Sequence, residues 1–191
     1  MPELFIIAGC NGAGKTTAAY TLLPNVFNTS EFINADEIAR GINPNNVEAA
    51  AFSAGKIMLK KINDFIENKK SFAFETTLSG NTYFDIITRA KDSGFAITLF
   101  FVYIENVEIA LERVAFRVLK GGHNIPDDVV KRRYLKGLQN LSKYLGIAHE
   151  WYILDNSKSE YSTIAKFLEG NREIIDFNKF NLIYNDGNQK K

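Results

Sequence analysis

The segment of this 191-residue chain with the clearest chemical character is a glycine-rich stretch near its start. Residues 9–16, with the sequence GCNGAGKT, fit the pattern G-x-x-x-x-G-K-[ST] at every fixed position. In such a loop, backbone N–H groups point inward around nucleotide phosphates, and the positive end of the following helix adds to the attraction. The stretch follows an apolar run at 4–8 and precedes a helical pattern, which is the context that the motif requires. We therefore predict a phosphate-binding loop (P-loop).

The ligand expected at this loop is ATP or GTP together with Mg²⁺. Lys15 is expected to reach the β- and γ-phosphates, and the hydroxyl of Thr16 to bind the metal ion. The residues that we expect to contact the nucleotide here are Gly9, Asn11, Gly12, Ala13, Gly14, Lys15, Thr16 and Thr17.

Acidic residues stand at or near the ends of four expected strands. They are Asp36, Glu75, Glu105 and Asp155. Ligands of open α/β sheets gather at the carboxyl ends of the strands, so one of these acids is expected to help hold Mg²⁺ and another to deprotonate an acceptor hydroxyl. Glu105 is interpreted as a solvated acid at the start of a helix.

Asp36 is the candidate general base, because it directly follows the second expected strand and should face the P-loop across the cleft. The alternative is that Asp36 only caps the next helix, with Glu37 in its first turn. Glu75, followed by two threonines, suits a metal ion or the substrate, and its alternative is an ordinary turn after a strand.

Phosphoryl transfer also needs cations on the transferring group. Four arginines bracket the pair Gly121-Gly122, and they are Arg113, Arg117, Arg132 and Arg133. Arg117 and Arg133 lie beside the apolar stripes of their expected helices, so they are the two candidates for catalysis. The alternative is that these are solvated basic faces. The catalytic interpretation makes residues 117–133 a lid that supplies arginines in cis.

The elements that must position these residues alternate along the chain. Short apolar runs that predict strands occur at 4–8, 31–35, 72–76, 97–104 and 151–155, and helical patterns occur at 14–23, 46–68, 81–93, 106–120, 127–146 and 158–169. This alternation is typical of parallel sheets covered by helices on both faces, so we predict a three-layer α/β P-loop NTPase or kinase fold. Residues 1–184 are expected to form a single domain, with a small hairpin or edge strand after Gly170 and a polar tail at 185–191.

The composition of the chain indicates which classes of binding partner to expect. With 23 Lys and Arg against 22 Asp and Glu, the formal net charge is +1, which disfavours nucleic acid or an anionic membrane as partner. No run approaches the roughly 20 apolar residues needed to cross a bilayer. The single cysteine, Cys10, forms no internal disulfide, and its place near a helix start favours a lowered pKa for its thiol. A cytoplasmic protein is expected.

Several segments together resemble the zeta-toxin family of P-loop kinases. In chain order they are AGCNGAGKTT, FINADEIARGINP, FAFETTLSG, RVAFRVLKGGHNIPDDVVKRRY and WYILDNS. The resemblance implies an ATP- or GTP-dependent kinase that phosphorylates a hydroxyl of a small molecule, such as a nucleotide sugar or a dinucleotide. Toxins of this family phosphorylate a UDP-linked amino sugar and are neutralised by a small antitoxin, so an antitoxin partner is also implied.

The same resemblance implies roles for individual residues. It places Lys15 and Thr16 on the phosphates and Mg²⁺, and Asp36 as base for the acceptor hydroxyl. It places Glu75 and Thr77 near the substrate, Arg117 and Arg133 on the transferring phosphate, and Asn156 with Ser157 near the nucleotide base.

Two other function classes stay open. A P-loop ATPase or nucleotide-dependent switch needs no base that faces an acceptor, so Asp36 is the residue that separates it from a kinase. A polynucleotide kinase requires a basic groove, for which residues 60, 61, 69 and 70, all lysines, are the candidates.

Overall fold

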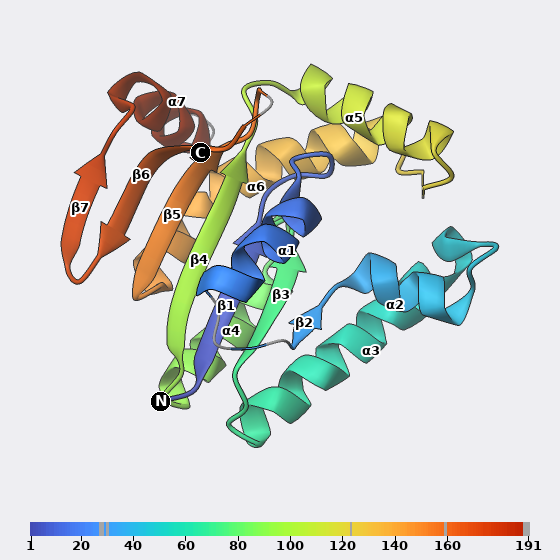
Figure 1. Ribbon diagram of the computed structural model, residues 1–191, viewed down its shortest axis with the longest axis horizontal. Coiled ribbons are helices and arrows are strands. Elements are labelled where there is room, and N and C mark those ends of the chain that lie inside the picture. Colours follow the sequence, from blue (N-terminus) through green and yellow to red (C-terminus); the bar gives the residue numbers. More distant parts are fainter. Residues whose placement is uncertain (27–28, 30, 123, 159, 189–191) are drawn as a thin grey trace.

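The protein is built on one seven-stranded sheet. The computed structural model describes residues 1–26, 29, 31–122, 124–158 and 160–188, and all statements below concern these residues. The strands lie in the order β2-β3-β1-β4-β5-β6-β7. Their bounds are β1 Glu3–Ala8, β2 Phe32–Ile33, β3 Phe72–Thr76, β4 Ala96–Tyr103, β5 Glu150–Asp155, β6 Ser162–Leu168 and β7 Asn171–Ile174. Strands β1 to β5 pair in parallel, whereas β6 pairs antiparallel to β5 and β7 antiparallel to β6 (Figure 1).

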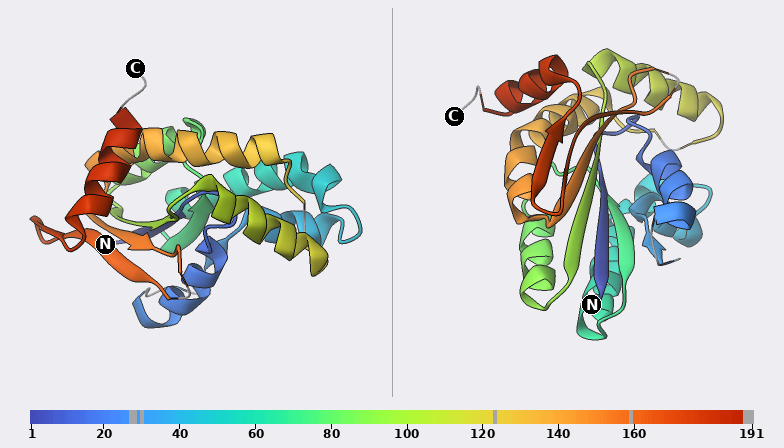
Figure 2. Two further views of the ribbon diagram at one scale, coloured as in Figure 1. Left: turned by 90° about the horizontal axis from the view of Figure 1, so that it is seen from above. Right: turned by 60° about the vertical axis from the view of Figure 1, so that its left-hand side comes forward.

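Helices cover both faces of this sheet, which makes three layers (Figure 2). Helices α1 and α5 pack on one face with the apolar cluster that contains Phe5 and Ile7, and α3, α4, α6 and α7 pack on the other with the cluster that contains Leu4 and Ile6. The bounds are α1 Lys15–Val26, α2 Ala35–Ile42, α3 Val47–Glu67, α4 Thr82–Asp92, α5 Val107–Leu119, α6 Asp127–Ile147 and α7 Phe177–Asn188. The three-layer α/β fold expected from the sequence is confirmed.

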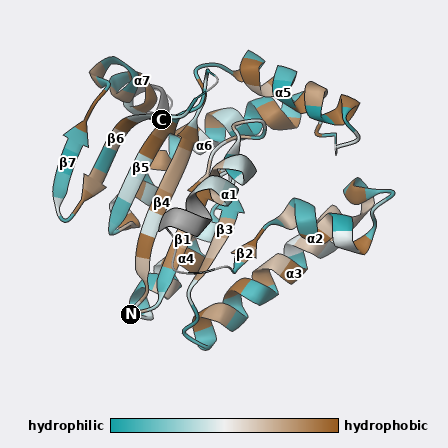
Figure 3. Ribbon diagram, viewed as in Figure 1, coloured by the Kyte–Doolittle hydropathy of each residue, from teal (hydrophilic) through white to brown (hydrophobic). Residues whose placement is uncertain are grey.

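The central strands are apolar on both faces because both faces are covered. Five of the six residues of β1 are buried, and alternate residues enter opposite clusters, Leu4 and Ile6 on one side and Phe5 and Ile7 on the other. Figure 3 shows hydrophobic residues concentrated in β1 and β4, the two strands at the centre of the sheet. Because both faces of these strands are buried, their register is strongly specified where the site is built.

Most elements expected from the sequence form within one to three residues of the expected bounds. This holds for β1, β3, β4 and β5 and for the helices α1, α3, α4, α5 and α6. The second strand is shorter than expected, because β2 contains only Phe32 and Ile33. Helix α2 begins at Ala35, and no residue range was predicted for it from the sequence.

The expected helix at 158–169 is wrong, because residues Ser162–Leu168 form strand β6, antiparallel to β5. A two-residue turn then leads into β7, where Glu169 and Gly170 both have positive φ, 50° and 80°. Leu168 pairs with Asn171 across this turn, which is the geometry of a tight hairpin. The short β-branched and aromatic run at 162–168 is typical of a strand, and the βα alternation earlier in the chain misled the prediction.

The edge strand expected after Gly170 is confirmed as β7, but the rest of that segment folds as helix α7, which was not expected. Phe180 and Ile183 of α7 are buried in the same cluster as β5 and α6. Residues 185–188, expected to belong to a tail, are the last turn of this helix, and 189–191 lie outside the described residues.

The carboxyl ends of four strands meet at one edge of the sheet. Ala8 is in register with Thr76 of β3 and Phe101 of β4, and Tyr103 with Asp155 of β5. The backbone N–H of Gly9 donates to the Thr76 carbonyl at 3.2 Å, which extends the β1–β3 ladder into the P-loop. The P-loop and the acids that follow these strands are therefore neighbours.

Helix α6 is hydrogen-bonded to the loop that follows β3. Asn140 Nδ2 donates to the Leu78 carbonyl at 2.6 Å, and Tyr144 Oη donates to that of Gly80 at 3.1 Å. At Gly137 the helix backbone comes so close that an added Cβ would lie 2.8 Å from the Thr77 carbonyl oxygen. This glycine is therefore needed for close packing of α6 against the loop.

We expect Gly137→Ala to lower the free energy of unfolding by about 1–2 kcal/mol, because overpacking against backbone exceeds the gain in helix propensity. The matched control is Gly146→Ala on the same helix, where an added Cβ meets nothing within 4 Å. That control should leave stability unchanged or raise it by up to about 1 kcal/mol. Urea unfolding of both variants tests the pair, and equal effects would contradict the packing argument.

Candidate active site around the phosphate-binding loop

The P-loop wraps the N-terminus of α1 and is held closely from behind. An added Cβ at Gly9 would lie 2.4 Å from the Val102 carbonyl oxygen, and one at Gly12 would lie 2.6 Å from that of Ala110. The loop is therefore packed against β4 and α5 through its own backbone. Its inner side is left for the ligand that the motif predicts.

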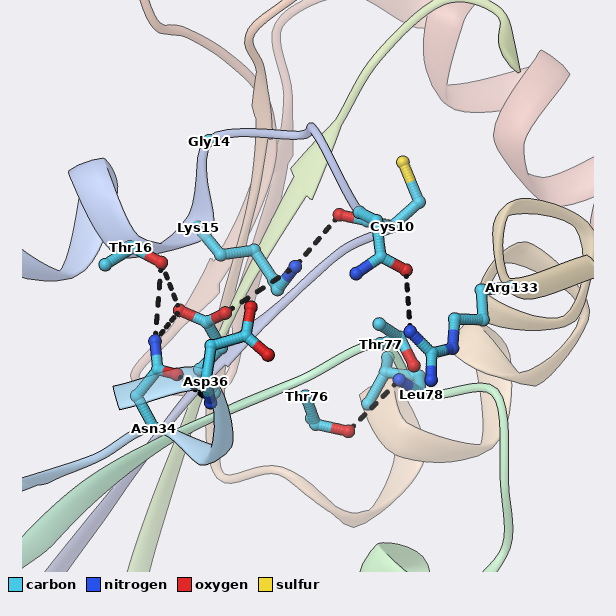
Figure 4. A network of polar contacts seen from close by, with 12 residues as sticks. Cys10, Gly14, Lys15, Thr16, Asn34, Asp36, Thr76, Thr77, Leu78 and Arg133 are labelled. Carbon is cyan, nitrogen blue, oxygen red and sulfur yellow. Dashed lines mark hydrogen bonds and ion pairs between the residues drawn. The ribbon is translucent and has the colours of Figure 1, made fainter. Parts of the chain in front are cut away.

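Lys15 is buried in the loop, with only 6% of its side chain exposed. Its Nζ donates to the Cys10 carbonyl at 2.9 Å and lies 3.8 Å from Glu75 Oε1 (Figure 4). A buried ammonium group needs such partners. These two partners keep the ammonium group of Lys15 inside the loop. Phosphate oxygens of a nucleotide would replace the two partners or bind beside them.

Thr16, Asn34 and Glu75 form a hydrogen-bonded triangle beside Lys15. The Thr16 hydroxyl donates to Glu75 Oε2 at 2.7 Å, and Asn34 Nδ2 donates to the same oxygen at 3.1 Å. Asn34 Nδ2 also lies 3.4 Å from Thr16 Oγ1. Because β3 is adjacent to β1, the carboxylate at the end of β3 meets the P-loop hydroxyl directly.

This donor set fits Mg²⁺. Mg²⁺ takes few protein ligands when phosphates and water supply the rest. The hydroxyl of Thr16 and the carboxylate of Glu75, which are in hydrogen-bond contact, are ligands of the right kind. Among the residues that the structure describes, no group of three or more His, Cys, Asp or Glu is arranged as a metal site. The two residues named from the sequence for the metal, Thr16 and Glu75, are thus brought together.

Asp36 lies in the first turn of α2, on the opposite side of the site from the arginines of α5. It does not cap the helix: Asn34 is the N-cap, and Asn34 Oδ1 accepts from the N–H groups of Asp36 at 2.7 Å and Glu37 at 3.3 Å. The capping alternative for Asp36 is therefore wrong. Its side chain is 41% exposed and lies 3.7 Å from Arg117 Nη1 across the cleft.

Three arginines face the site from two helices. Arg113 and Arg117 of α5 line the cavity in front of the P-loop, and Arg133 of α6 donates to Asn11 Oδ1 at 3.1 Å. Burial lowers the pKa of Arg133, and nearby Asp36 counteracts that effect. Arg132 is exposed and is not among the residues that line the P-loop cavity or the cavity beside it. Arg117 and Arg133 are the candidates for catalysis chosen from the sequence, and the structure places Arg113 at the site as well.

Two adjoining cavities open at the carboxyl edge of the sheet. The P-loop cavity, about 220 Å³, is lined by Asn11, Gly12, Gly14, Lys15, Thr16, Thr17, Asp36, Glu75, Arg113 and Arg117. The second cavity, about 180 Å³, is lined by Asn11, Lys15, Asn34, Ala35, Asp36, Met58, Glu75, Thr76, Thr77, Tyr83 and Arg133. Four residues line both cavities and so lie where the two meet: Asn11, Lys15, Asp36 and Glu75.

The second cavity has a polar wall and an apolar wall. Thr77 belongs to the polar side and its hydroxyl is hydrogen-bonded to that of Ser79 at 2.8 Å. Met58 and Tyr83 form the apolar side, and Tyr83 Oη lies 3.3 Å from the Met58 sulfur. Burial raises the pKa of Tyr83. Such a cavity suits a small molecule with both hydroxyl groups and apolar surface.

The loop after β5 lies behind the P-loop. Asn156 Nδ2 donates to the Ala13 carbonyl at 2.8 Å, and Tyr161 Oη donates to the Gly14 carbonyl at 2.9 Å. Asn156 was expected near the nucleotide base, and neither residue lines the two cavities. Tyr161 was not expected at all.

The remaining acids at strand ends lie outside the two cavities. Glu105 is exposed, as its interpretation as a solvated acid predicted. Asp155 is buried; burial by itself raises its pKa, but hydrogen bonds from Lys179 and Ser157 outweigh this and lower it. Asp155 therefore stays ionised as a structural partner of Lys179 on α7.

Cys10 contradicts the expectation of a lowered thiol pKa. Its side chain is 6% exposed and packs in the cluster with Val102 and Ala110. Burial raises the pKa of the thiol to about 11, although Lys15 pulls it down. The thiol lies in the apolar core and not on the inner side of the loop.

Some residues of the site left weak signals in the sequence. Arg113 stands four positions before Arg117, which places both on one face of a helix. Asn34, just before an acidic helical turn, has the position of an N-cap. Met58, Tyr83 and Tyr161 had no such signal, because only the folded chain brings them to the site.

The three-layer fold and the GxxxxGK loop together define a class, the P-loop proteins. A family model described as Zeta toxin matches residues 1–160, which is most of the chain. The protein therefore belongs to the Zeta toxin family, as the resemblance of its motifs indicated. In the part of the chain that the structure describes, no helix has the length and apolar character needed to cross a bilayer.

The chain is also similar to known proteins in sequence and in fold. A Haemophilus influenzae protein described as uncharacterized is 38% identical over 129 residues, which are 66% of this chain and 88% of the relative. AvrRxo1-ORF1, solved with AvrRxo1-ORF2 and ATP, superposes with a TM-score of 0.76 at 17% identity over 96% of this chain, which spans only 64% of the solved one.

A structure from the PezAT chromosomal toxin–antitoxin system of Streptococcus pneumoniae superposes with a TM-score of 0.66 at 14% identity. The superposition covers 100% of this chain and 88% of the Streptococcus pneumoniae chain. At these identities the solved structures establish the fold.

We expect Cys10, the single cysteine, to resist alkylation in the folded protein, because a pKa near 11 leaves almost no thiolate at pH 8. A thiol-reactive dye should label the native protein at least about 100-fold more slowly than the urea-unfolded protein. Rapid labelling of the native protein at pH 8 would show that the thiol is accessible and ionised.

Proposed function

We propose that this protein is a kinase that transfers the γ-phosphoryl group of ATP, or of GTP, to a hydroxyl of a small molecule. The observation that carries the proposal is that Lys15 and Asp36 line both cavities where the two meet. A nucleotide in the P-loop cavity and an acceptor in the second cavity would thus face each other across a cation and a potential base. Family membership supports the same class of reaction.

In this proposal the P-loop amides and Lys15 hold the β- and γ-phosphates. Mg²⁺, when bound, neutralises charge on the phosphate oxygens. Thr16 provides a ligand, and Glu75, hydrogen-bonded to Thr16, orients it or reaches the ion through water. Asn34 keeps the Glu75 carboxylate in place.

The transfer step uses Asp36 as the general base. The acceptor oxygen forms a bond to the γ-phosphorus, the bond from that phosphorus to the β,γ-bridging oxygen breaks, and the hydroxyl proton passes to the Asp36 carboxylate. Arg117 is 3.7 Å from Asp36 and can turn to the γ-phosphate, while Arg133 enters from α6. Cations at these positions stabilise the charge that develops on the transferring group.

Residues 117–133, the end of α5 and the start of α6, form the lid in this proposal, with residue 123 outside the described part. We also propose that 1–184 act as a single domain. A nucleotide sugar or dinucleotide is the proposed acceptor, with Glu75 and Thr77 among its contacts. A cytoplasmic location and an antitoxin partner belong to the proposal as well, the latter supported by the toxin–antitoxin system of the Streptococcus relative.

A nucleotide-dependent switch without an acceptor is the competing function. It explains the P-loop cavity but gives no role to the second cavity or to the position of Asp36 at its boundary. The geometry therefore favours the kinase.

We expect Asp36→Asn to lower kcat by roughly 10²-fold or more while ATP binding stays within twofold, because a base acts on the acceptor and not on the nucleotide. The matched control is Glu37→Gln, the next acid of the same helical turn, whose carboxylate accepts from Tyr20 and lines neither cavity. The assay incubates each protein with ATP, Mg²⁺ and a metabolite extract and detects phosphorylated products by mass spectrometry.

A product that requires Asp36 and survives in the control supports the kinase. Conversion of ATP to ADP with no phosphorylated metabolite, unchanged in Asp36→Asn, would replace the kinase by an ATPase or switch.

We expect Glu75→Gln to raise the Mg²⁺ concentration for half-maximal ATP turnover by about 10–100-fold, since a neutral amide orients the Thr16 hydroxyl and supports the cation less well. Glu105→Gln is the control, because Glu105 also follows a strand but is exposed and lines neither cavity. Titration of Mg²⁺ at constant ATP makes the comparison. The same Mg²⁺ requirement in both variants would exclude Glu75 from the metal site.

A further inference from the structure

The loop between β5 and β6 contacts the P-loop through two side chains that are remote from it in sequence. Asn156 Nδ2 donates to the Ala13 carbonyl at 2.8 Å, and Tyr161 Oη donates to the Gly14 carbonyl at 2.9 Å. The two acceptors are consecutive peptide carbonyls in the GxxxxGK motif. Two donors thus hold two successive peptide units.

Gly14 makes this contact geometrically allowed. Its φ is +95°, and a Cβ there would lie 2.4 Å from Asn156 Nδ2 and 2.9 Å from Tyr161 Oη. The absence of a side chain at this position therefore serves two needs, the left-handed backbone and the close approach of both donors. Residues 156 and 161 fill the space that a side chain would take.

The consequence follows from the planar trans peptide. Within one peptide unit the C=O and the next residue's N–H point in opposite directions. A carbonyl of Ala13 held toward Asn156 turns the Gly14 N–H away from it, and a carbonyl of Gly14 held toward Tyr161 does the same for the Lys15 N–H. Helix α1 shares in the second restraint, because the Ala18 N–H also donates to Gly14 O at 2.9 Å.

The loop that supplies the donors is itself anchored. The Asn156 N–H donates to the Tyr103 carbonyl at 2.9 Å, which continues the β4–β5 ladder. Asp155 accepts from the Ser157 N–H at 2.8 Å and is paired with Lys179 of α7. Burial raises the pKa of the Tyr161 hydroxyl, which is protonated at neutral pH even at its ordinary pKa. The restraint on the P-loop is therefore built into the antiparallel end of the sheet.

We propose that Asn156 and Tyr161 are positioning residues that hold the Gly14 and Lys15 amides toward the phosphates of the bound nucleotide. The inference rests on the proposed function and adds to it a cause for the phosphate affinity of the loop. It gives Asn156 a role different from contact with the nucleotide base, because its Nδ2 is engaged by the loop and the residue lines neither cavity.

The test compares binding of Mg²⁺-ATP with binding of Mg²⁺-tripolyphosphate, which has the phosphates without base or ribose. Calorimetry is carried out on wild type, Tyr161→Phe and Asn156→Ala. Each variant should bind both ligands about 5- to 10-fold more weakly, the effect of one lost hydrogen bond, and by the same factor for both. Tyr134→Phe is the matched control, because the Tyr134 hydroxyl also donates to backbone carbonyls, but to those of Ile104 at 3.3 Å and Glu105 at 3.1 Å, after β4.

A spectroscopic readout separates positioning from general stability. In ¹H–¹⁵N spectra the Gly14 and Lys15 amides should shift in Tyr161→Phe and stay in place in Tyr134→Phe. Tyr161→Phe keeps the ring, so the test stands even where Asn156→Ala fails to fold.

Three results would overturn the inference. They are unchanged affinity for both ligands in Tyr161→Phe, loss of ATP affinity without loss of tripolyphosphate affinity, and wild-type protein that binds ATP but not tripolyphosphate. The second result would indicate contact with the base. Wild-type protein that binds neither ligand would overturn the proposed function first, and the inference with it.

Discussion

The hydrogen bond between the Thr16 hydroxyl and the Glu75 carboxylate is the contact on which the site depends. It joins the P-loop after β1 to the end of the neighbouring strand β3, so it exists only because the two strands pair in parallel and end level. Asn34, at the end of β2, donates to the same carboxylate oxygen and also starts helix α2. The start of α1, the end of β3 and the residue after β2 thus meet at one carboxylate oxygen, and α2 begins where Asp36 lines the same cavities as Lys15.

The rest of the site is arranged around this junction. Helix α5 contributes Arg113 and Arg117 from one side, and α6 brings Arg133 while holding the loop of Thr77 through Asn140. The antiparallel end of the sheet supports the P-loop from behind. A rigid sheet edge of this kind permits two cavities to share Lys15 and Asp36, and a shared wall is what transfer between two bound molecules requires.

Most elements with a clear local sequence pattern were predicted, and features that depend on contacts between distant residues were not. The central strands and most helices were predicted because a buried parallel strand and an amphipathic helix leave periodic patterns in the sequence. Two elements near the end of the chain were not: β6 was expected as a helix because the preceding βα alternation outweighed its own β-branched and aromatic residues, and α7 packs on a cluster that distant residues create. Cys10 shows the same limit: its helix-start position suggested a lowered pKa, but burial raises it.

By itself the sequence determined the P-loop, its lysine and threonine, and the acids that must follow the strands, because these depend on local spacing. It also determined the family, because the motifs keep their order along the chain. Only the tertiary structure decided which acid meets Thr16, which arginines reach the cavities and that Asn156 and Tyr161 hold the loop. Those pairings join residues up to 147 positions apart, and only the packing of the sheet and its helices brings them together.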